Sequence, residues 1–312
     1  MLNATRLKVL REVVNSGSFS AAADALSYSQ SAVSQAIATL EGEVGTTLIE
    51  RDRGGVRPTA AGAALVIHAE GILGRMEAAE TELAAIAGGE AGRLRIASFP
   101  SAGATLVPQA IAAFSAGHPG VEVTLAEGEP EEIAPRLRGG EFDLALLYEF
   151  EGVGERLATG IRRFELLEDP LHLALPTAHP LARRRQVRLE DLREESWVQT
   201  SVSGPCARHV VRSCHAAGFE PRVSFESDDY QTVQGLVAAG VGVALIPQTA
   251  LSTVRDDIVV RPLAPQSPVR KVFAATPRTA AATAAVATML DVLRREARIR
   301  SRPPGGGRET AP

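Results

Sequence analysis

The chain of 312 residues contains little cysteine, few aromatic side chains and almost no lysine. Its two cysteines are too few for a disulfide framework. Charge or glycine soon breaks every apolar run, so no stretch of about 20 apolar residues predicts a membrane span and we expect no membrane partner. The N-terminus lacks the apolar stretch and cleavage site of a signal peptide, so we expect a cytoplasmic protein.

An excess of positive charge is also missing, because the net charge of the whole chain is −4. Taken alone, this value argues against a nucleic-acid-binding protein. A small DNA-binding module in a larger protein would not change that total, so the charge has to be read locally. The chain is too long for one typical domain, and its hydrophobic fraction of 45% suits folded domains with real cores.

Residues 3–44 predict three helices with apolar side chains at helical spacing. Ser18 and Ser29 are suited to cap the second and third helices, which a short polar turn separates. Two short helices joined by a tight turn are typical of a helix-turn-helix. Residues 48–58 predict a hairpin that turns at Gly54-Gly55, and Thr59 is suited to cap the helix that follows.

Residues 60–87 predict one long helix. Its apolar stripe consists of Leu65, Ile72, Met76, Leu83 and Ile86. A helix of this length cannot bury such a stripe within a small domain, so we expect it to pair with a second helix in a homodimer.

From Arg93 onward the pattern alternates between strands and helices, which predicts an α/β fold with a largely parallel sheet. The expected strands are 94–97, 121–125, 142–147, 171–175, 197–199, 223–225, 241–246 and 269–275. The expected helices are 103–116, 131–138, 205–217, 229–239 and 279–298. Residues 301–312 have the composition of a disordered tail.

The stretch from Gly17 to Gly62 resembles the LysR-type transcriptional regulators. The resemblance is carried by SFSAAA at 18–23, by SQSAVSQ at 29–35, and by LIER at 48–51 followed by PTAAG at 58–62. Further on, HP at 118–119, FDLA at 142–145 and VGVA at 241–244 also resemble the family. The resemblance implies a winged helix-turn-helix, a long linker helix and a two-lobed α/β effector domain like that of periplasmic binding proteins.

On this basis we expect a DNA-binding domain at 1–58, a linker and dimerisation helix at 59–90, an effector domain at 91–300 and the tail at 301–312. The implied function is transcription regulation without enzymatic activity, controlled by a small molecule. Double-stranded DNA, that small-molecule effector and a second copy of the chain are the expected partners. The resemblance further implies a homotetramer built from dimers, and it implies no cofactor.

A recognition helix reads base edges in the major groove with its N-terminal turns. The residues expected to face DNA there are Ser29, Gln30, Ser31, Ser34 and Gln35. Glutamine can form two hydrogen bonds to adenine, whereas Val33 and Ile37 face the other way. The arginines of the hairpin, Arg51, Arg53 and Arg57, are expected to neutralise phosphates, although Arg51 could instead form an internal salt bridge.

Ligands of two-lobed α/β domains bind at the C-terminal ends of the strands. One loop expected to line this site contains Ser98, Pro100, Ser101 and Ala102, and the facing loop contains Thr200, Ser201, Val202 and Ser203. Tyr148, Asp228 and Pro247 lie at further strand ends or helix starts. Ordinary helix capping by Ser101, Ser203 and Asp228 is the alternative interpretation.

Other functions find less support in the sequence. Cys206 and Cys214 lie about 12 Å apart along one predicted helix, too far for one metal ion or a disulfide, so we expect no metal site. They would suit an oxidant-sensing regulator only if a thiolate formed and the helix rearranged, and buried core cysteines are the preferred interpretation. A solute-binding protein would explain residues 91–298 but not residues 1–58. The sequence contains no nucleophile-elbow, phosphate-loop or metalloprotease motif.

Overall fold

The computed structural model describes residues 2–52, 55–86, 92–151, 160–200, 204–278 and 283–300. The expected glycine turn at Gly54 and the expected tail at 301–312 lie outside these ranges. The chain forms two compact units. The first consists of Met1–Gly92 with Pro135–Asp143, and the second of Arg93–Ala134 with Leu144–Pro312.

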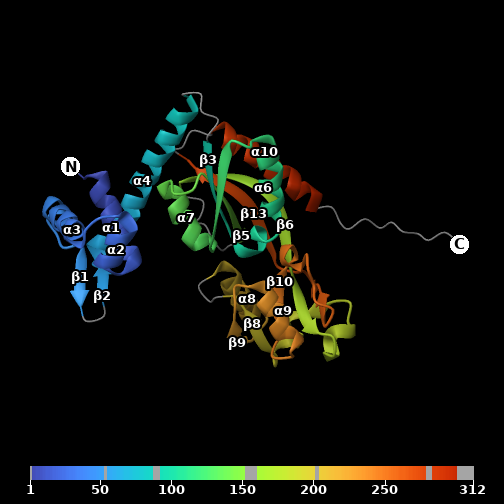
Figure 1. Ribbon diagram of the computed structural model, residues 1–312. Helices are drawn as coiled ribbons and strands as arrows, with labels where there is room; N and C mark the ends of the chain where they lie inside the picture. Colours follow the sequence, from blue (N-terminus) through green and yellow to red (C-terminus); the bar gives the residue numbers. More distant parts are fainter. Residues whose placement is uncertain are drawn as a thin grey trace. The chain divides into compact units, whose positions relative to one another are not determined.

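The N-terminal part of the first unit consists of helices and a hairpin (Figure 1). These elements are α1 (Ala4–Ser16), α2 (Phe19–Leu26), α3 (Gln30–Val44), β1 (Ile49–Asp52), β2 (Gly55–Pro58) and α4 (Ala60–Ile86). The second half of α7 (Pro130–Gly139) also belongs to this unit. Ser18 caps α2 by accepting a hydrogen bond from the N–H of Ala21 at 3.3 Å, and Ser29 caps α3 in the same way through Ala32 at 3.2 Å. Thr59 accepts from the N–H of Gly62 at the start of α4, so all three predicted caps are confirmed.

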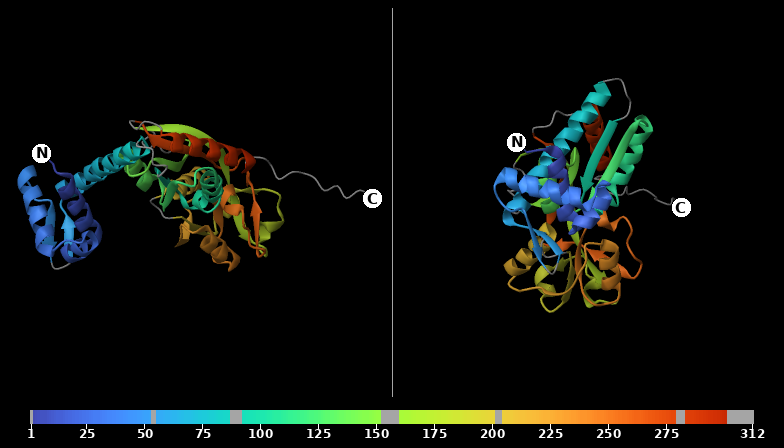
Figure 2. Two further views of the ribbon diagram at one scale, coloured as in Figure 1. Left: turned by 45° about the horizontal axis from the view of Figure 1, so that its top comes forward. Right: turned by 60° about the vertical axis from the view of Figure 1, so that its left-hand side comes forward.

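The core of the first unit lies between α1, α2, α3 and the first turns of α4. It contains Leu7, Leu10 and Val13 of α1, Phe19 and Ala22 of α2, Val33, Ile37 and Leu40 of α3, and Val66 and Ala69 of α4. The hairpin is tied to this core because the Glu41 carboxylate accepts hydrogen bonds from the N–H groups of Leu48 and Ile49, at 2.7 and 3.2 Å. The right-hand view of Figure 2 shows the strands of the hairpin extending away from the helices of this unit.

The second unit alternates strands and helices. Its first half contains β3 (Gly92–Ser98), α5 (Pro100–Gly103), α6 (Leu106–Gly117), β4 (Val121–Glu127), α7 (Pro130–Gly139) and β5 (Leu144–Phe150). The chain continues through β6 (Ile161–Pro176), β7 (Val187–Arg188), β8 (Ser196–Gln199), α8 (Pro205–Ala216), β9 (Arg222–Glu226), α9 (Tyr230–Ala238) and β10 (Ala244–Pro247). It ends with β11 (Ile258–Arg261), β12 (Leu263–Ala264), β13 (Val269–Pro277) and α10 (Ala284–Arg300). The 3-10 helices η1 (Pro180–Arg183), η2 (Leu189–Leu192) and η3 (Gln248–Leu251) fill connections.

The main sheet has the strand order β10-β6-β13-β5-β3-β4, and β11 also pairs with β6. The expectation of a largely parallel sheet is wrong at its centre. β3 runs parallel to β5, but β13 runs antiparallel to both β5 and β6. The sequence also predicted only the end of β6, because charged residues such as Arg162, Glu165 and Glu168 interrupt the apolar pattern of its first half.

Strand β6 divides the second unit into two lobes. Its residues 161–170 pair with β13, and its residues 171–176 pair with β10 and β11. A smaller core cluster in the second lobe contains Val198, Val233, Val237 and Ile246, while Trp197, Cys206 and Leu245 of the same lobe belong to the large core cluster of the unit. Figure 1 shows β8, β9, α8, α9 and β10 gathered in this lobe, while α6 and α10 lie side by side on the first. No helix among the described residues is long and apolar enough to cross a membrane.

Candidate functional site

The N-terminal turns of α3 present polar side chains to solvent. Gln30, Ser31 and Gln35 are exposed, Ser34 is half-buried, and Val33 lies in the core on the opposite face. This is the arrangement that a recognition helix needs, because the helix is held by its apolar face while the polar face stays available for base edges. Ser29 is exposed as well, but its hydroxyl already caps the helix and lies 2.9 Å from the Ser31 hydroxyl.

The hairpin pairs Glu50 with Arg57 and Arg51 with Val56. Arg57 is exposed, so its guanidinium is available to a phosphate. Arg53 lies outside the described residues, and the structure gives only the backbone pairing of Arg51. Neither the expected phosphate contact of Arg51 nor the alternative internal salt bridge is therefore tested.

In the second unit, the loop after β3 lies where the sequence predicted one wall of an effector site. Pro100 begins α5, and Ser98, Ser101 and Ala102 are buried. The alternative interpretation of Ser101 as a helix cap is wrong, because Phe99 occupies that position. The Ser98 hydroxyl donates to the carbonyl of Phe99 at 3.2 Å.

Ser101 belongs to a buried polar cluster that sequence reasoning missed. Arg270 of β13 lies opposite Asp169 of β6, and its Nε donates to the Asp169 carboxylate at 2.8 Å. A terminal nitrogen of Arg270 donates to the hydroxyls of Ser101 and Thr249. Asp169 also accepts from the hydroxyl of Thr249 at 2.7 Å and from its N–H at 3.0 Å. These four residues, called the Arg270 cluster below, connect both lobes at the crossing strands.

Aromatic rings and one carboxyl group surround the Arg270 cluster. The guanidinium of Arg270 lies 4.6 Å from the centre of the Tyr148 ring and 4.8 Å from that of Phe99, so both rings stabilise its charge. The Tyr148 hydroxyl donates to Glu129 at 2.7 Å. Burial raises the pKa of Glu129 above its usual value, and the Tyr148 hydrogen bond opposes that shift.

The expected second wall is described in part. Thr200, at the end of β8, is buried, whereas Ser201, Val202 and Ser203 lie outside the described residues. Thr200 lines a small cavity together with Trp197, Gln199, Cys206 and Tyr230. This cavity, called the Thr200 cavity below, measures about 10 Å³. Buried atoms of three of its residues lack a hydrogen-bond partner among the residues that the structure describes: Trp197 Nε1, Gln199 Oε1 and Thr200 Oγ1.

Two further residues predicted to contact the effector, Asp228 and Pro247, lie at the start of α9 and at the end of β10. Asp228 is exposed, and the cap of α9 is its neighbour Asp229, whose carboxylate accepts from the N–H groups of Gln231 and Thr232. The alternative interpretation of Asp228 as a cap is therefore wrong by one residue. Pro247 ends β10 and precedes η3, which carries Thr249 of the Arg270 cluster.

Both cysteines are buried as free thiols. Burial raises the pKa of Cys206 to about 11 and that of Cys214 to about 12. Thiolates, which react with oxidants, are therefore scarce at neutral pH, and this supports the interpretation of both residues as core cysteines. Within the described residues, no three histidine, cysteine or acidic side chains are grouped to hold a metal ion.

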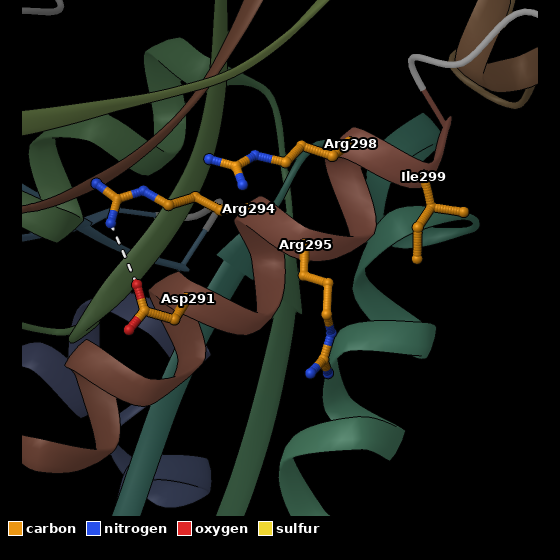
Figure 3. Close-up of a pocket in the computed structure, with 5 residues that line it drawn as sticks. All are labelled: Asp291, Arg294, Arg295, Arg298 and Ile299. Carbon is orange, nitrogen blue, oxygen red and sulfur yellow. Dashed lines mark hydrogen bonds and ion pairs between the residues drawn. The ribbon is translucent and has the colours of Figure 1, made fainter.

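A second hollow, of about 610 Å³, lies on the exposed side of α10 (Figure 3). It is lined by Asp291, Arg294, Arg295, Arg298 and Ile299. Arg294 donates to Asp291 at 3.3 Å and lies over the Phe164 ring. Since Arg298 falls in the last turn, it also stabilises the partial negative charge at the helix C-terminus. Arg294 and Arg298 therefore have structural roles on this surface.

Two family descriptions match the chain. Residues 4–63 match "Bacterial regulatory helix-turn-helix protein, lysR family", and residues 87–298 match "LysR substrate binding domain". The chain is 33% identical over 302 residues to "Probable HTH-type transcriptional regulator LrrA" of Synechococcus elongatus, covering 95% of this chain and 98% of that protein. It is 30% identical over 231 residues to "Transcriptional dual regulator GltC" of Bacillus subtilis, covering 74% and 76% of the two chains.

Solved structures of similar fold include full-length CbnR in complex with its target DNA, with a TM-score of 0.68 and 23% identity, covering 95% of this chain and all of that one. At this identity the likeness shows the fold alone. The LysR family regulator HinK of Pseudomonas aeruginosa is 30% identical, with a TM-score of 0.58, and the match covers 95% of this chain and 98% of that chain.

Proposed function

Because this chain belongs to the LysR family of bacterial transcriptional regulators, we propose that it reads operator DNA with Gln30, Ser31, Ser34 and Gln35 of α3. It is a DNA-binding regulator with an effector-binding domain and not an enzyme. Ser29 orients the same turn as its cap. Arg51, Arg53 and Arg57 of the hairpin neutralise phosphates beside the groove.

One observation carries this proposal: the first turns of α3 expose polar side chains while Val33, Ile37 and Leu40 anchor the opposite face in the core. A glutamine on such a surface can form the paired hydrogen bonds that distinguish adenine from other bases.

The effector, in this proposal, binds between the two lobes. Its contacts come from Ser98, Pro100, Ser101, Ala102 and Tyr148 of the first lobe and from Thr200, Ser201, Val202, Ser203, Asp228 and Pro247 of the second. Buried oxygen atoms of Gln199 and Thr200, which lack a hydrogen-bond partner in the described part of the chain, support this placement, because buried polar atoms need such partners. The Arg270 cluster spans both lobes, so a ligand that touches Ser101 also acts on the strands that connect them.

The proposed assembly is a homodimer through α4, with two dimers forming a tetramer in the cytoplasm. Residues 1–58 form the DNA-binding domain, 59–90 the linker and 91–300 the effector domain in this proposal. Exposed apolar residues along α4, among them Ile72, Met76 and Leu83, support the dimer, since exposed apolar stripes on long helices favour pairing.

The test separates base reading from phosphate binding. Gln35→Ala should weaken binding to the operator beside the gene by roughly tenfold or more, because a lost base contact costs about 1–3 kcal/mol, and should leave binding to random DNA nearly unchanged. Arg57→Ala is the matched control on the hairpin and should weaken binding to both DNAs similarly while reducing the salt dependence. Mobility-shift titrations at several salt concentrations measure both effects. Equal losses on the two DNAs for Gln35→Ala would contradict its role as a reader.

A further inference from the structure

The helix α7 is shared by the two units of the chain. Its residues 130–134 belong to the second unit, which contains both lobes, and its residues 135–139 belong to the first unit, which contains α4. Pro135 lacks the N–H that would bond to the carbonyl of Glu131, but the helix continues through it. Contacts at the two ends of α7 therefore act on different parts of the molecule.

The first turn of α7 is bound by α8 of the second lobe. Arg208 of α8 forms an ion pair with Glu131, and the two side chains are 45% and 36% exposed. The neighbouring His209 stacks its ring on Phe150 of β5, so α8 is held against the first lobe at two points. A partly exposed ion pair contributes little to stability, so a change in the position of α8 can break it at low cost.

The last turn of α7 packs on α4 through glycines. A Cβ atom on Gly74 would lie 2.4 Å from the carbonyl oxygen of Gly140, and one on Gly71 would lie 3.0 Å from that of Gly139. A side chain at Gly74 would therefore force the two backbones apart. Since Gly71 and Gly74 are three positions apart, they lie on one face of α4 and form a single contact with the end of α7.

The turn that follows α7 is fixed by its own hydrogen bonds. The Nε of Arg136 donates to the Glu141 carboxylate at 2.9 Å, and the N–H of Glu141 donates to the carbonyl of Arg136 at 3.1 Å. Gly140 closes the turn with a φ of +84°, which glycine adopts without strain. Closely packed backbones transmit strain, so a shift of α7 either displaces α4 at this contact or opens it.

We propose that α7 couples the position of the second lobe to α4: Arg208 acts on its first turn, and Gly71 and Gly74 receive the movement at its last turn. At about 3.6 residues per turn, these glycines lie on the side of α4 away from Ile72 and Met76, so the contact is compatible with the proposed dimer. This inference rests on the proposed function, in which the effector acts through the lobes, and it adds the route to the DNA-binding domain.

Hydrogen exchange measured by mass spectrometry on the full chain tests this route without an effector. Arg208→Gln removes the ion pair with Glu131 and should raise the exchange rate of residues 66–76 in α4 by roughly twofold or more. In a Gly74→Ala background the route is already broken, so Arg208→Gln should change that rate much less. Such a failure of two distant substitutions to act independently measures their coupling. Gly71→Ala, with its longer contact, provides a milder break if Gly74→Ala does not fold.

Glu131→Gln removes the same ion pair from the other side and should reproduce the effect of Arg208→Gln on α4. Glu132→Gln is the matched control, because it removes a carboxylate from an exposed position in the same turn of α7 and should leave the exchange of α4 unchanged. Unchanged exchange of α4 in Arg208→Gln, an equal change in Glu132→Gln, or independent effects of Arg208→Gln and Gly74→Ala would overturn the proposal. Mobility shifts of the unmodified protein with operator DNA test the proposed function separately, so the two failures are distinguishable.

Discussion

At the scale of single residues, Arg270 and Asp169 form an ion pair between the lobes that no local sequence pattern predicts. Arg270 and Asp169 are 101 positions apart in the chain, yet they face each other in neighbouring antiparallel strands. In the sequence, Asp169 follows Glu168 and Arg270 precedes Lys271, so nothing local marks either residue as buried. Removing either partner would leave an unpaired buried charge, which is why such pairs are sensitive to substitution.

Histidine 209 should make stability depend on pH. Its ring stacks on Phe150 with centroids 4.1 Å apart, and burial together with the positive charge of Arg212 lowers its pKa to about 4. The unfolded chain binds a proton at its ordinary pKa near 6.5, so the unfolded state gains protons first. The free energy of unfolding should therefore fall as the pH drops from about 6.5 to about 4. Allowing for solvent screening, the loss is on the order of 1 kcal/mol.

Urea unfolding followed by circular dichroism across this pH range measures the effect. His209→Phe keeps a stacked ring but cannot be protonated, so its stability should fall less over the same interval. A profile for His209→Phe that superimposes on that of the unmodified protein would refute the assignment.

At the scale of secondary-structure elements, the backbone of α4 at Gly62 lies in close contact with the carbonyl group of Leu48, just before β1. A Cβ atom on Gly62 would lie 2.0 Å from the carbonyl oxygen of Leu48, so the helix and the strand would have to separate. We expect Gly62→Ala to lower the free energy of unfolding by about 1–3 kcal/mol through this overpacking. Thermal unfolding of the full chain, followed by circular dichroism, measures the change.

Gly42, in the last turn of α3, provides the control because a Cβ atom there would meet nothing within 4 Å. Alanine loses less backbone freedom than glycine in a helix, so Gly42→Ala should stabilise the first unit by up to about 1 kcal/mol. The two variants introduce the same methyl group and should shift the unfolding temperature in opposite directions. Destabilisation of the same size in both would show that contact with Leu48 is not the cause.

The elements predicted best are those whose formation depends on local signals. The helices from α1 to α4 begin at capping residues such as Ser18, Ser29 and Thr59, and their apolar spacing is visible in the sequence. Strand β6 was recognised only at its apolar end, because exposed charged side chains interrupt the apolar pattern of its first half. The antiparallel position of β13 depends on pairing across more than a hundred residues, which no local pattern encodes.

The same distinction applies to the candidate site. The exposed face of α3 follows from helical periodicity, so Gln30 and Gln35 could be proposed from the sequence. Ser101, Tyr148 and Thr200 could be proposed as residues at strand ends. Their surroundings could not be proposed, because Glu129, Thr249 and Arg270 reach this region from elements far apart in the chain.

At the scale of the whole molecule, regulation requires that the effector domain and the DNA-binding domain act within one assembly. Dimeric regulators place two recognition helices in successive major grooves, about 34 Å apart, and this spacing depends on the helices that join the two chains. In this chain α4 is the element suited to join them. Ile72, Met76 and Leu83 follow the a and d spacing of paired helices, and all three are exposed in the single chain.

We therefore predict that Met76→Glu combined with Leu83→Glu shifts the protein to monomers at micromolar concentration and weakens operator binding at least tenfold. Two carboxylates on the paired face would have to be buried without counter-ions, which costs more than the apolar contacts return. Sedimentation velocity measures the mass, and mobility shifts measure the affinity.

Ile299→Glu is the control, because Ile299 is as exposed as these residues but belongs to α10 of the second unit. It should leave both measurements unchanged. If the double variant keeps the mass of the unmodified protein, α4 does not join the chains, and another surface must set the spacing of the recognition helices.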